Sequence, residues 1–285
     1  MNSSIFNSAD PIAWCPGCGD FGILSAVKKA LADIGRDPRD ILLVSGIGQA
    51  AKLPHYVHAN CFNGLHGRAL CAAAGAKIAN RELTVIVTTG DGDCYGEGGN
   101  HFIHNVRRNL DITVVVHDNQ IYGLTKGQAS PTTEEGYATT VQTRGVVLEP
   151  IRPLSLALAL GCGFVARGFS GEPDHLASLI VQGVAHRGFS LIDALQPCVS
   201  FNRKNTFAWY KQRIYKLEEG SGHDPSNRAA AMVKAEEWGD RIPLGVIYRA
   251  EKPCYEDKSG LASLKPLVEY GPEEIDFAGI AREFQ

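Results

Sequence analysis

Glycine and aspartate alternate in one short turn of this sequence, Gly90-Asp91-Gly92-Asp93, and further glycines follow at positions 96, 98 and 99. The turn comes directly after the apolar run 84–89 and before a segment with helical character. Glycine lets the backbone approach a ligand closely, and the start of a helix presents free N–H groups and a positive dipole end. The turn is therefore typical of a phosphate or diphosphate site. A GxGxxG fingerprint is absent, which disfavours a dinucleotide-binding Rossmann domain.

A second polar pair, Asp118-Asn119, ends the next apolar run, and Asn119 stands 28 positions after Asp91. Consecutive strands of a parallel sheet often end side by side, an arrangement that brings the side-chain oxygens of Asp91 and Asn119 together. Such oxygens suit a Mg²⁺ ion that bridges two phosphates, with the backbone carbonyl of Ile121 as a third ligand. A tight acidic turn and an Asx turn, both common in loops, explain the same residues without any ligand.

The cysteines point to a metal centre. Eight cysteines are many for a cytoplasmic protein, where clustered thiols more often bind metal than form disulfides. Cys15 and Cys18 form a CxxC motif just before a predicted helix, and an iron–sulfur cluster, zinc and a redox dithiol all remain open for it. Cys198 directly follows the apolar run 191–195, so it is a candidate further ligand at a strand end.

The elements that must position these residues alternate along the chain. Expected strands are 41–45, 84–89, 112–117 and 191–195, and helical character is found in 21–34, 68–80 and 99–109. Because nearly every expected strand is apolar on both faces, we predict an α/β fold, with a mostly parallel sheet covered by helices on both faces. Such sheets bind ligands beyond the carboxyl ends of their strands. Composition changes near residue 200, which predicts a binding domain in 1–200 and a C-terminal extension in 201–285.

Composition excludes several classes of partner. The chain has 285 residues, 44% of them hydrophobic, and a formal net charge of -3, so nothing favours binding to nucleic acid or to a membrane surface. No apolar run approaches the roughly 20 residues that span a bilayer, and the first residues lack the features of a signal peptide. We therefore expect a cytoplasmic location.

Taken together, several stretches between residues 12 and 215 resemble the beta subunits of 2-oxoacid:ferredoxin oxidoreductases. Those stretches read WCPGCGDFGIL, VSGIG, GLHGRAL, GDGDCYGEGGNHFIHNVRRN, DNQIYGLTKGQASPT and QPCVSFNRKNTFAWYKQRIYKLE. The resemblance implies a thiamine diphosphate-binding fold, with Mg²⁺ and a 4Fe-4S cluster as further cofactors and ferredoxin as electron acceptor. Within it, Asp118 stands where the thiamine diphosphate signature usually has the first of two asparagines, whereas Asn119 matches the second.

The resemblance also implies the cluster ligands. Cys15, Cys18 and Cys198 match three of them, but many members of the family read SGIGC where this chain has Gln49. We expect Cys61 to replace the missing cysteine, because it follows the same strand, and Cys71 is the rival. For Cys162 and Cys254, which match no ligand, the ordinary role is that of a small buried side chain.

Further site residues follow from the same resemblance. His66 is expected to face the cofactor, while Lys52 and Lys126 are expected to pair with a substrate carboxylate. A structural histidine and solvent-exposed lysines are the alternatives. The residues expected to contact the cofactor are Gly90, Asp91, Gly92, Asp93, Cys94, Asn119, Ile121, Gly123 and Leu124.

The implied activity is thiamine-dependent oxidative decarboxylation of a 2-oxoacid to acyl-CoA and CO2, with electrons passed through the cluster to ferredoxin. In the reverse direction the enzyme fixes CO2, as in a reductive tricarboxylic acid cycle. The stretches GIGQAAKLPH and GDGDCYGEGG favour 2-oxoglutarate over pyruvate. A non-redox thiamine enzyme and a cluster-bearing subunit without thiamine are the alternatives.

The activating glutamate of thiamine enzymes has no match in this chain, and in the family it comes from an alpha subunit. The resemblance therefore implies an (αβ)2 heterotetramer, in which the chain is inactive without its partner, and we expect the C-terminal extension 201–285 to pack on that partner.

Overall fold

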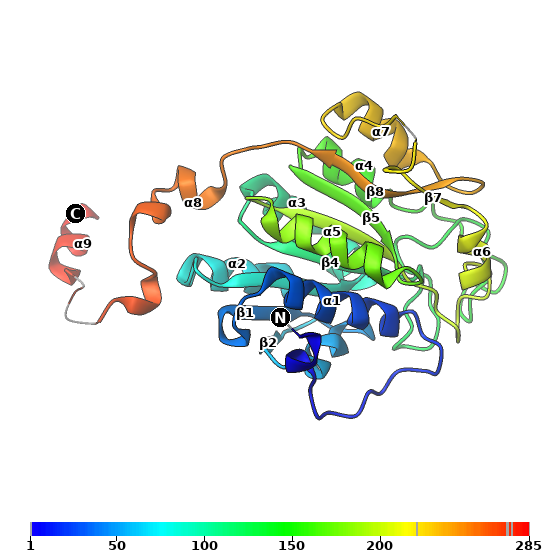
Figure 1. Ribbon diagram of the computed structural model, residues 1–285, viewed down its shortest axis with the longest axis horizontal. Coiled ribbons are helices and arrows are strands. Elements are labelled where there is room, and N and C mark those ends of the chain that lie inside the picture. Colours follow the sequence, from blue (N-terminus) through cyan, green and yellow to red (C-terminus); the bar gives the residue numbers. More distant parts are fainter. Residues whose placement is uncertain (1, 221, 272–273, 275, 285) are drawn as a thin grey trace.

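A computed structural model describes residues 2–220, 222–271, 274 and 276–284. Its centre is one eight-stranded sheet in the order β2-β1-β3-β4-β6-β5-β8-β7 (Figure 1). The strands are β1 Ile41–Ser45, β2 Asn60–Asn63, β3 Thr84–Gly90, β4 Thr113–Asp118, β5 Phe164–Phe169, β6 Ser190–Leu195, β7 Ile214–Lys216 and β8 Ile242–Arg249.

The first six strands are mutually parallel, so their carboxyl ends share one edge of the sheet. β8 runs antiparallel to β5, and β7 pairs with β8 in parallel. β3 and β4 are direct neighbours, with Gly90 in register with His117. Consequently the turn after Gly90 and the pair Asp118-Asn119 lie next to each other at that edge.

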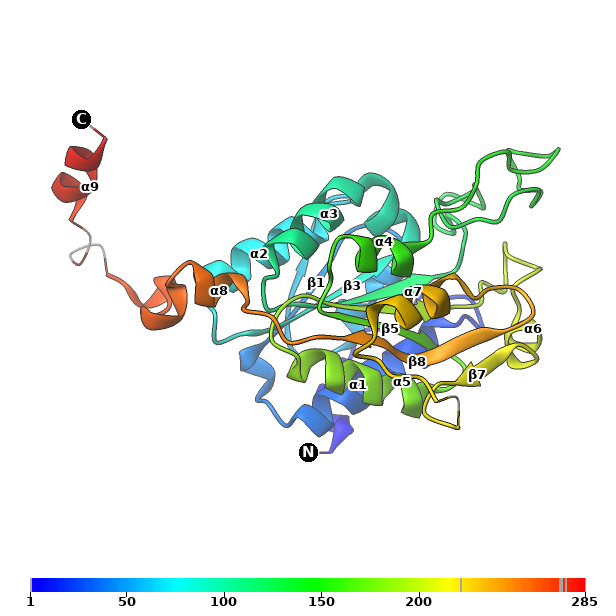
Figure 2. The ribbon, with the colours of Figure 1, turned by 90° about the horizontal axis from the view of Figure 1, so that it is seen from above.

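Two layers of helices bury the sheet (Figure 2). On one face Val114 and Val116 of β4 pack among apolar residues of α2, α3, α4 and α7, while the intervening Val115 faces α1 and α5 on the other. This alternation is the two-residue period of a strand that is buried on both sides. The helices are α1 Asp20–Ile34, α2 Ala69–Ala79, α3 Gly99–Arg108, α4 Pro153–Ala159, α5 Pro173–Ala185, α6 Phe207–Lys211, α7 Arg228–Glu236, α8 Tyr255–Lys258 and α9 Phe277–Glu283.

The predicted fold class is confirmed, and the four expected strands correspond to β1, β3, β4 and β6. The structure adds β2, β5, β7 and β8. Because β7 and β8 extend the same sheet, the region after residue 200 is not a separate appendage over its whole length. Beyond α8, the segment that we call the C-terminal arm (described residues 259–271, 274 and 276–284) contacts α2 through Leu267–Glu269 and then leaves the body of the molecule (Figures 1 and 2).

The segment between β4 and α4, residues 119–152, has no helix or strand; it begins at the carboxyl edge of the sheet and projects beyond it (Figure 2). It carries Asn119, Ile121 and the rest of the motif DNQIYGLTKGQASPT. Among the described residues, no helix combines the length and apolar character needed to cross a bilayer.

Candidate cofactor and cluster site

The turn after β3 brings Asp91 against the end of β4. Thr132 from the segment 119–152 lies between them: its hydroxyl donates to Asp91 Oδ2 at 2.6 Å and is 3.0 Å from Asp118 Oδ1. All three side chains are buried. The expected proximity of the two strand ends is therefore present, and it is reinforced by a threonine that sequence reasoning did not assign.

Asn119 occupies the next position at the same edge. Its side-chain Oδ1 accepts a hydrogen bond from the Ile121 N–H at 2.9 Å, and Asn202 Nδ2 donates to its backbone carbonyl at 3.0 Å. The Asx turn offered as an alternative interpretation is thus present. It leaves Oδ1 with a second lone pair for a cation. Within the described chain no N–H or O–H donates to the Ile121 carbonyl.

Buried acidic groups accumulate under this edge. Burial, together with the nearby Asp193 and Asp91 charges, raises the pKa of Asp118 well above its usual range. Burial also raises the pKa of Asp91, and it raises that of Asp193 to about 6 despite the neighbouring Arg167. A group of carboxylates that resists ionisation is what a divalent cation would stabilise in the charged form.

Asp93 does not offer its oxygens to the open space of the site. Its Oδ1 accepts from His66 Nδ1 at 2.6 Å and from the backbone N–H groups of Gly67 and Ile47 at 2.7 and 3.1 Å, and its Oδ2 accepts from Thr89 Oγ1 at 2.6 Å. The carboxylate therefore ties three loops together. We assign it a positioning role rather than direct contact with a cofactor.

His66 is held by this carboxylate at one nitrogen. With Nδ1 against Asp93, the other nitrogen Nε2 lies 3.4 Å from Glu97 Oε2. Tyr122 closes the group, since its hydroxyl donates to Glu97 Oε2 at 3.0 Å and its ring stands edge-on to the His66 ring at 6.2 Å. A histidine fixed in this way can hold or transfer a proton at Nε2.

A cavity of about 80 Å³ runs between these groups. Most of the expected residues line it: His66, Gly90, Asp91, Gly92, Asp93, Asn119, Ile121, Gly123 and Leu124. Cys94 does not, because its side chain points into the apolar core shared with α2 and α3. Within the π-helical turn 92–97, Cys94 thus packs in the core while the neighbouring Asp93 contacts His66.

Neither expected lysine lines this cavity. Lys52 Nζ donates to the Ala13 carbonyl at 3.2 Å, so it braces the segment before the CxxC motif. Lys126 is exposed at the tip of the turn between Tyr122 and Gln128, with a φ of 80°, next to the lining residue Thr125.

A second cavity adjoins the first. Cys15, Cys18 and Cys198 all line it, and it shares Gln49, Asn119 and Gly123 with the cofactor cavity. The two cavities thus have a common wall. This arrangement brings the CxxC motif and the cysteine after β6 to one place, as the spacing of the sequence led us to expect.

Polar groups surround the thiols of this second cavity. Ser200 Oγ donates to Cys15 Sγ at 3.2 Å, and Gln196 Nε2 donates to Cys18 Sγ at 3.3 Å. Burial raises the pKa of Cys18 strongly, and Asp20 adds to the effect. In the described parts of the chain, no three His, Cys, Asp or Glu side chains are already drawn close enough to hold a metal ion.

Cys61 and Cys71 lie apart from this group. Cys61 is exposed in the middle of the edge strand β2, in register with Leu43, and it lines neither cavity. Cys71 is exposed in the first turn of α2, where its thiol lies 3.0 Å from the Arg68 carbonyl. The expectation that Cys61 completes the cluster therefore has no support from its position, because Cys61 lies within β2 and not at the carboxyl edge that the site occupies.

Comparisons with known proteins agree with this geometry. Residues 46–194 match the family described as thiamine pyrophosphate enzyme, C-terminal TPP binding domain. Residues 198–263 match the family that describes the C-terminal part of the pyruvate ferredoxin oxidoreductase beta subunits. The 2-oxoacid:ferredoxin oxidoreductase 1 subunit beta of Aeropyrum pernix is 46% identical over 86% of this chain and 80% of its own length.

The chain belongs to the 2-oxoacid:ferredoxin oxidoreductase beta subunits.

Two further similar proteins carry names that state their substrate. The 2-oxoglutarate synthase subunit KorB of Methanothermobacter marburgensis is 37% identical over 88% of this chain and 90% of its own length. A solved 2-oxoglutarate:ferredoxin oxidoreductase from Magnetococcus marinus, with 2-oxoglutarate, coenzyme A and succinyl-CoA bound, matches with a TM-score of 0.91 at 35% identity. The match covers 100% of this chain and 96% of that one.

Three groups of this beta subunit near the site are not predictable from a sequence motif. Thr132 belongs to the motif GQASPT, which was noted without a role, while Tyr122 and Glu97 confine His66. The third is a buried pair in which His117 Nδ1 lies 2.7 Å from Asp20 Oδ1, beneath Cys18. Each of the three groups joins residues that are distant in the chain, so no local sequence pattern predicts them.

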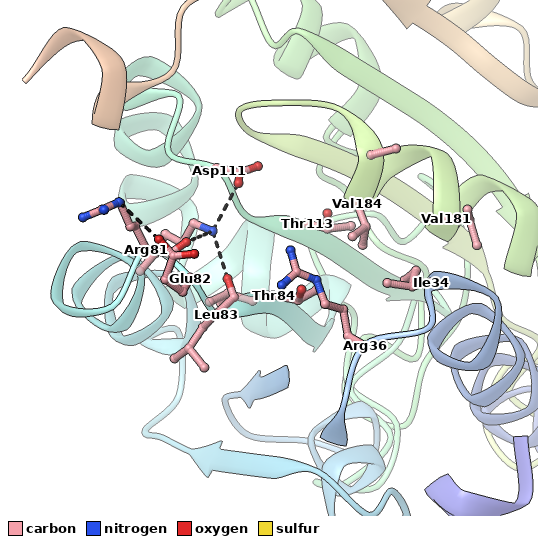
Figure 3. Close-up of a pocket in the computed structure, with 13 residues that line it drawn as sticks. Ile34, Arg36, Arg81, Glu82, Leu83, Thr84, Asp111, Thr113, Val181 and Val184 are labelled. Carbon is pink, nitrogen blue, oxygen red and sulfur yellow. Dashed lines mark hydrogen bonds and ion pairs between the residues drawn. The ribbon is translucent and has the colours of Figure 1, made fainter. Parts of the chain in front are cut away.

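The beta subunit also has a larger cavity, of about 360 Å³, at the amino ends of the strands (Figure 3). Lys77 is buried there. Its ammonium group donates to the Arg81 and Leu83 carbonyls, both at 2.9 Å, and pairs with Asp111 at 3.1 Å. Because these contacts use all three of its N–H groups, Lys77 joins α2 to the starts of β3 and β4 and leaves no donor for a ligand.

Proposed function

We propose that this beta subunit, with an alpha subunit, catalyses the oxidative decarboxylation of a 2-oxoacid. Coenzyme A accepts the acyl group, CO2 is released, and the two electrons pass to ferredoxin. The observation that carries the proposal is the common wall between the cavity of Asp91 and Asn119 and the cavity of the three cysteines. This adjacency supports the proposal, because electron transfer requires the two cofactors to lie close together.

We assign the diphosphate end of thiamine diphosphate to the first cavity. Asp91, Asn119 Oδ1 and the carbonyl of Ile121 would hold a Mg²⁺ ion, whose charge offsets the cost of the buried carboxylates. When bound, thiamine diphosphate supplies the nucleophilic carbon and the electron sink for decarboxylation. The protein contributes orientation and charge.

Replacement of Asp91 tests this assignment. We expect Asp91→Asn to weaken Mg²⁺-dependent binding of thiamine diphosphate by at least about 100-fold, roughly 2.7 kcal/mol, because a neutral ligand replaces a charged one. Calorimetry on the assembled enzyme measures the change, with Thr132→Val, which removes only the hydroxyl that holds Asp91, as the milder companion. Wild-type affinity in Asp91→Asn would refute the metal assignment.

His66 and the two lysines divide the remaining work. With its Nδ1 hydrogen held by Asp93, His66 is placed to hold or move a proton at Nε2 on the cavity wall. Lys126, beside the lining residues Leu124 and Thr125, is the candidate partner for a substrate carboxylate, whereas Lys52 supports the CxxC segment.

The second cavity supplies the redox part of the proposal. Cys15, Cys18 and Cys198 would ligate a 4Fe-4S cluster, whose chemistry is single-electron transfer to an acceptor such as ferredoxin. With reduced ferredoxin as donor, the same steps run in the carboxylating direction, which would place the enzyme in CO2 fixation.

The site is incomplete in this chain. No glutamate is found among the described residues that line the cofactor cavity, although thiamine activation uses one. We infer that an alpha subunit provides it and that the active unit is an (αβ)2 heterotetramer.

The decisive experiment compares the chain alone with the assembled enzyme, purified without oxygen. We expect the chain alone to be inactive, and the assembly to reduce a ferredoxin with 2-oxoglutarate in preference to pyruvate or branched 2-oxoacids. The basis for 2-oxoglutarate is the similarity to KorB and to the Magnetococcus enzyme. Full activity of the isolated chain would refute the partner requirement, and decarboxylation by an iron-free assembly would indicate a non-redox thiamine enzyme instead.

A further inference from the structure

Gln49 lies in the wall between the two cavities, at the position where the cysteine cavity lacks a fourth thiol. We propose that the side-chain amide oxygen of Gln49 is the fourth protein ligand of the cluster, so that three thiolates and one oxygen hold four irons. The inference rests on the proposed function, since it presupposes a cluster in this cavity.

The backbone at Gln49 is fixed next to the CxxC motif. Trp14, the residue before Cys15, donates its indole N–H to the Gln49 carbonyl at 2.9 Å. The indole is itself wedged edge-on between Phe21 and Tyr56, with ring centroids 5.4 and 4.9 Å away. Movement of the loop after β1 would break these contacts, so Gln49 is held in place relative to Cys15.

The Gln49 side chain ends in an unsatisfied oxygen. Its Oε1 is buried and accepts no hydrogen bond from any described residue. A buried amide oxygen without a donor is unfavourable, and such atoms in native proteins usually face a bound water, ion or ligand. Gln49 is itself a lining residue of the cavity that the three cysteines line, which makes iron the partner of suitable chemistry.

Other groups near the cysteines are less suited to this role. Gln196 also has a buried Oε1 without a donor, but its Nε2 is committed to Cys18 Sγ and the Pro197 carbonyl, so the amide serves as a donor to sulfur. Asp20 Oδ1 lies 2.7 Å from His117 Nδ1, and its Oδ2 lies 3.3 Å from Cys18 Sγ. Its carboxylate is therefore held by the buried His117 on one side and lies against Cys18 on the other.

The proposed ligand has a chemical consequence. A neutral amide oxygen binds iron less tightly than a thiolate does, so the iron at Gln49 is the labile one. On oxidation, the [4Fe-4S]²⁺ cluster gives one electron to an oxidant and releases that iron as Fe²⁺, leaving [3Fe-4S]⁺. Because Gln49 also lines the cofactor cavity, the labile iron is on the side of the thiamine site.

The test uses the anaerobically assembled enzyme and measures iron content and electron paramagnetic resonance before and after treatment with ferricyanide. We expect the wild type to lose about one of four irons per cluster and to develop the signal of a three-iron cluster. In Gln49→Cys a fourth thiolate should retain all four irons and leave the oxidised sample without that signal. Cys61→Ser, the matched control for the rival thiol, should behave as the wild type.

Three outcomes would overturn the inference. If the wild type and Gln49→Cys retain iron equally under ferricyanide, Gln49 is not a ligand, although the cluster of the proposed function stands. If the wild type keeps all four irons under ferricyanide while Cys61→Ser loses one, the fourth ligand is Cys61. If the wild-type assembly contains no iron while it binds thiamine diphosphate, both the inference and the redox part of the proposed function fail.

Discussion

One hydroxyl hydrogen serves two carboxyl groups at the centre of the site. Thr132 lies within hydrogen-bond distance of both Asp91 and Asp118, yet its single hydrogen can be donated fully to only one of them. A protonated Asp118 resolves the conflict, because its own O–H donates to Thr132 Oγ1 while Thr132 donates to Asp91. The raised pKa of Asp118 is consistent with this arrangement. The O–H of the protonated Asp118 then donates a hydrogen bond where the side-chain N–H of the usual asparagine would.

The first residue-scale prediction concerns Asp118→Asn. Because the folded-state pKa is raised, the wild type without metal is stabilised at low pH and loses that contribution as pH rises through the raised pKa. The asparagine variant does not titrate there. Its melting temperature in a chelator should therefore exceed that of the wild type by a growing margin, of a few degrees, between pH 5 and pH 9.

Thermal unfolding across that pH range checks the prediction, with Asp33→Asn at an exposed position as control. Added Mg²⁺ with thiamine diphosphate should narrow the margin. A constant difference at all pH values would show that Asp118 does not titrate in the folded chain.

The second residue-scale prediction concerns His66→Asn in the assembled enzyme. Loss of the group that holds a proton at Nε2 should lower kcat by roughly 100-fold and change its pH profile, with little effect on affinity for thiamine diphosphate. His58→Asn is the matched control, since His58 is exposed and its Nδ1 lies 3.2 Å from the Ile5 carbonyl. An unchanged pH profile would assign His66 a structural role.

At the scale of elements, the turn between β3 and α3 has no room for a side chain at Gly92. A Cβ atom on Gly92 would stand 2.2 Å from the ring of Tyr122, whereas one on Gly99, in the first turn of α3, would meet nothing within 4 Å. The ring of Tyr122 in turn confines His66. The two glycines therefore look alike in the sequence and differ in the structure.

We expect Gly92→Ala to displace Tyr122 and to lower both the melting temperature and the affinity for thiamine diphosphate, the latter by about 10-fold or more. Gly99→Ala should be neutral or stabilising, by up to about 1 kcal/mol, because alanine favours helix. Calorimetry with thiamine diphosphate and thermal unfolding of the two variants test this prediction. Equal effects of the two substitutions would mean that the close approach of Tyr122 is unimportant.

Much of this architecture is predictable from sequence, and the exceptions have physical causes. The strands β1, β3, β4 and β6 are predictable because each is a short apolar run, rich in β-branched residues, that is buried on both faces. β5 is obscured by the buried Arg167 and by Gly168, and β8 contains Pro243 and Gly245, residues that are unusual inside strands. Their local composition does not predict a strand, and they become strands because they pair with neighbours in the sheet.

The site divides in the same way. Asp91 and Asn119 were predictable because consecutive parallel strands fix which residues meet at their ends. Thr132 was not, since it reaches the site through the irregular segment 119–152, and nor was the position of Cys61 within β2. The placement of a short edge strand decides whether a cysteine reaches the shared edge, and the sequence alone did not indicate that placement.

At the scale of the whole molecule, the C-terminal arm stands apart. It touches the body near α2, where Arg81 donates to the Leu261 carbonyl at 3.3 Å, and then extends away from it (Figure 1). It exposes large apolar side chains, which in a free arm are unfavourable and fit an interface. They are Leu264, Leu267, Val268, Phe277, Ile280 and Phe284.

We predict that a chain ending at Lys258 keeps its fold but loses assembly with the alpha subunit. The melting temperature should change by only a few degrees, because the arm adds little to either core, whereas the heterotetramer should be lost in size-exclusion chromatography. The triple variant Phe277→Ser, Ile280→Ser, Phe284→Ser should reproduce the defect in part. Normal assembly of the shortened chain would leave the arm without a role at the interface.

The antiparallel return of β8 carries the chain back to the amino ends of the other strands, so that α8 and the arm emerge opposite the carboxyl edge of the sheet. A tether fixed to the arm would consequently leave the carboxyl edge, with its cofactor and cysteine cavities, open to soluble electron carriers.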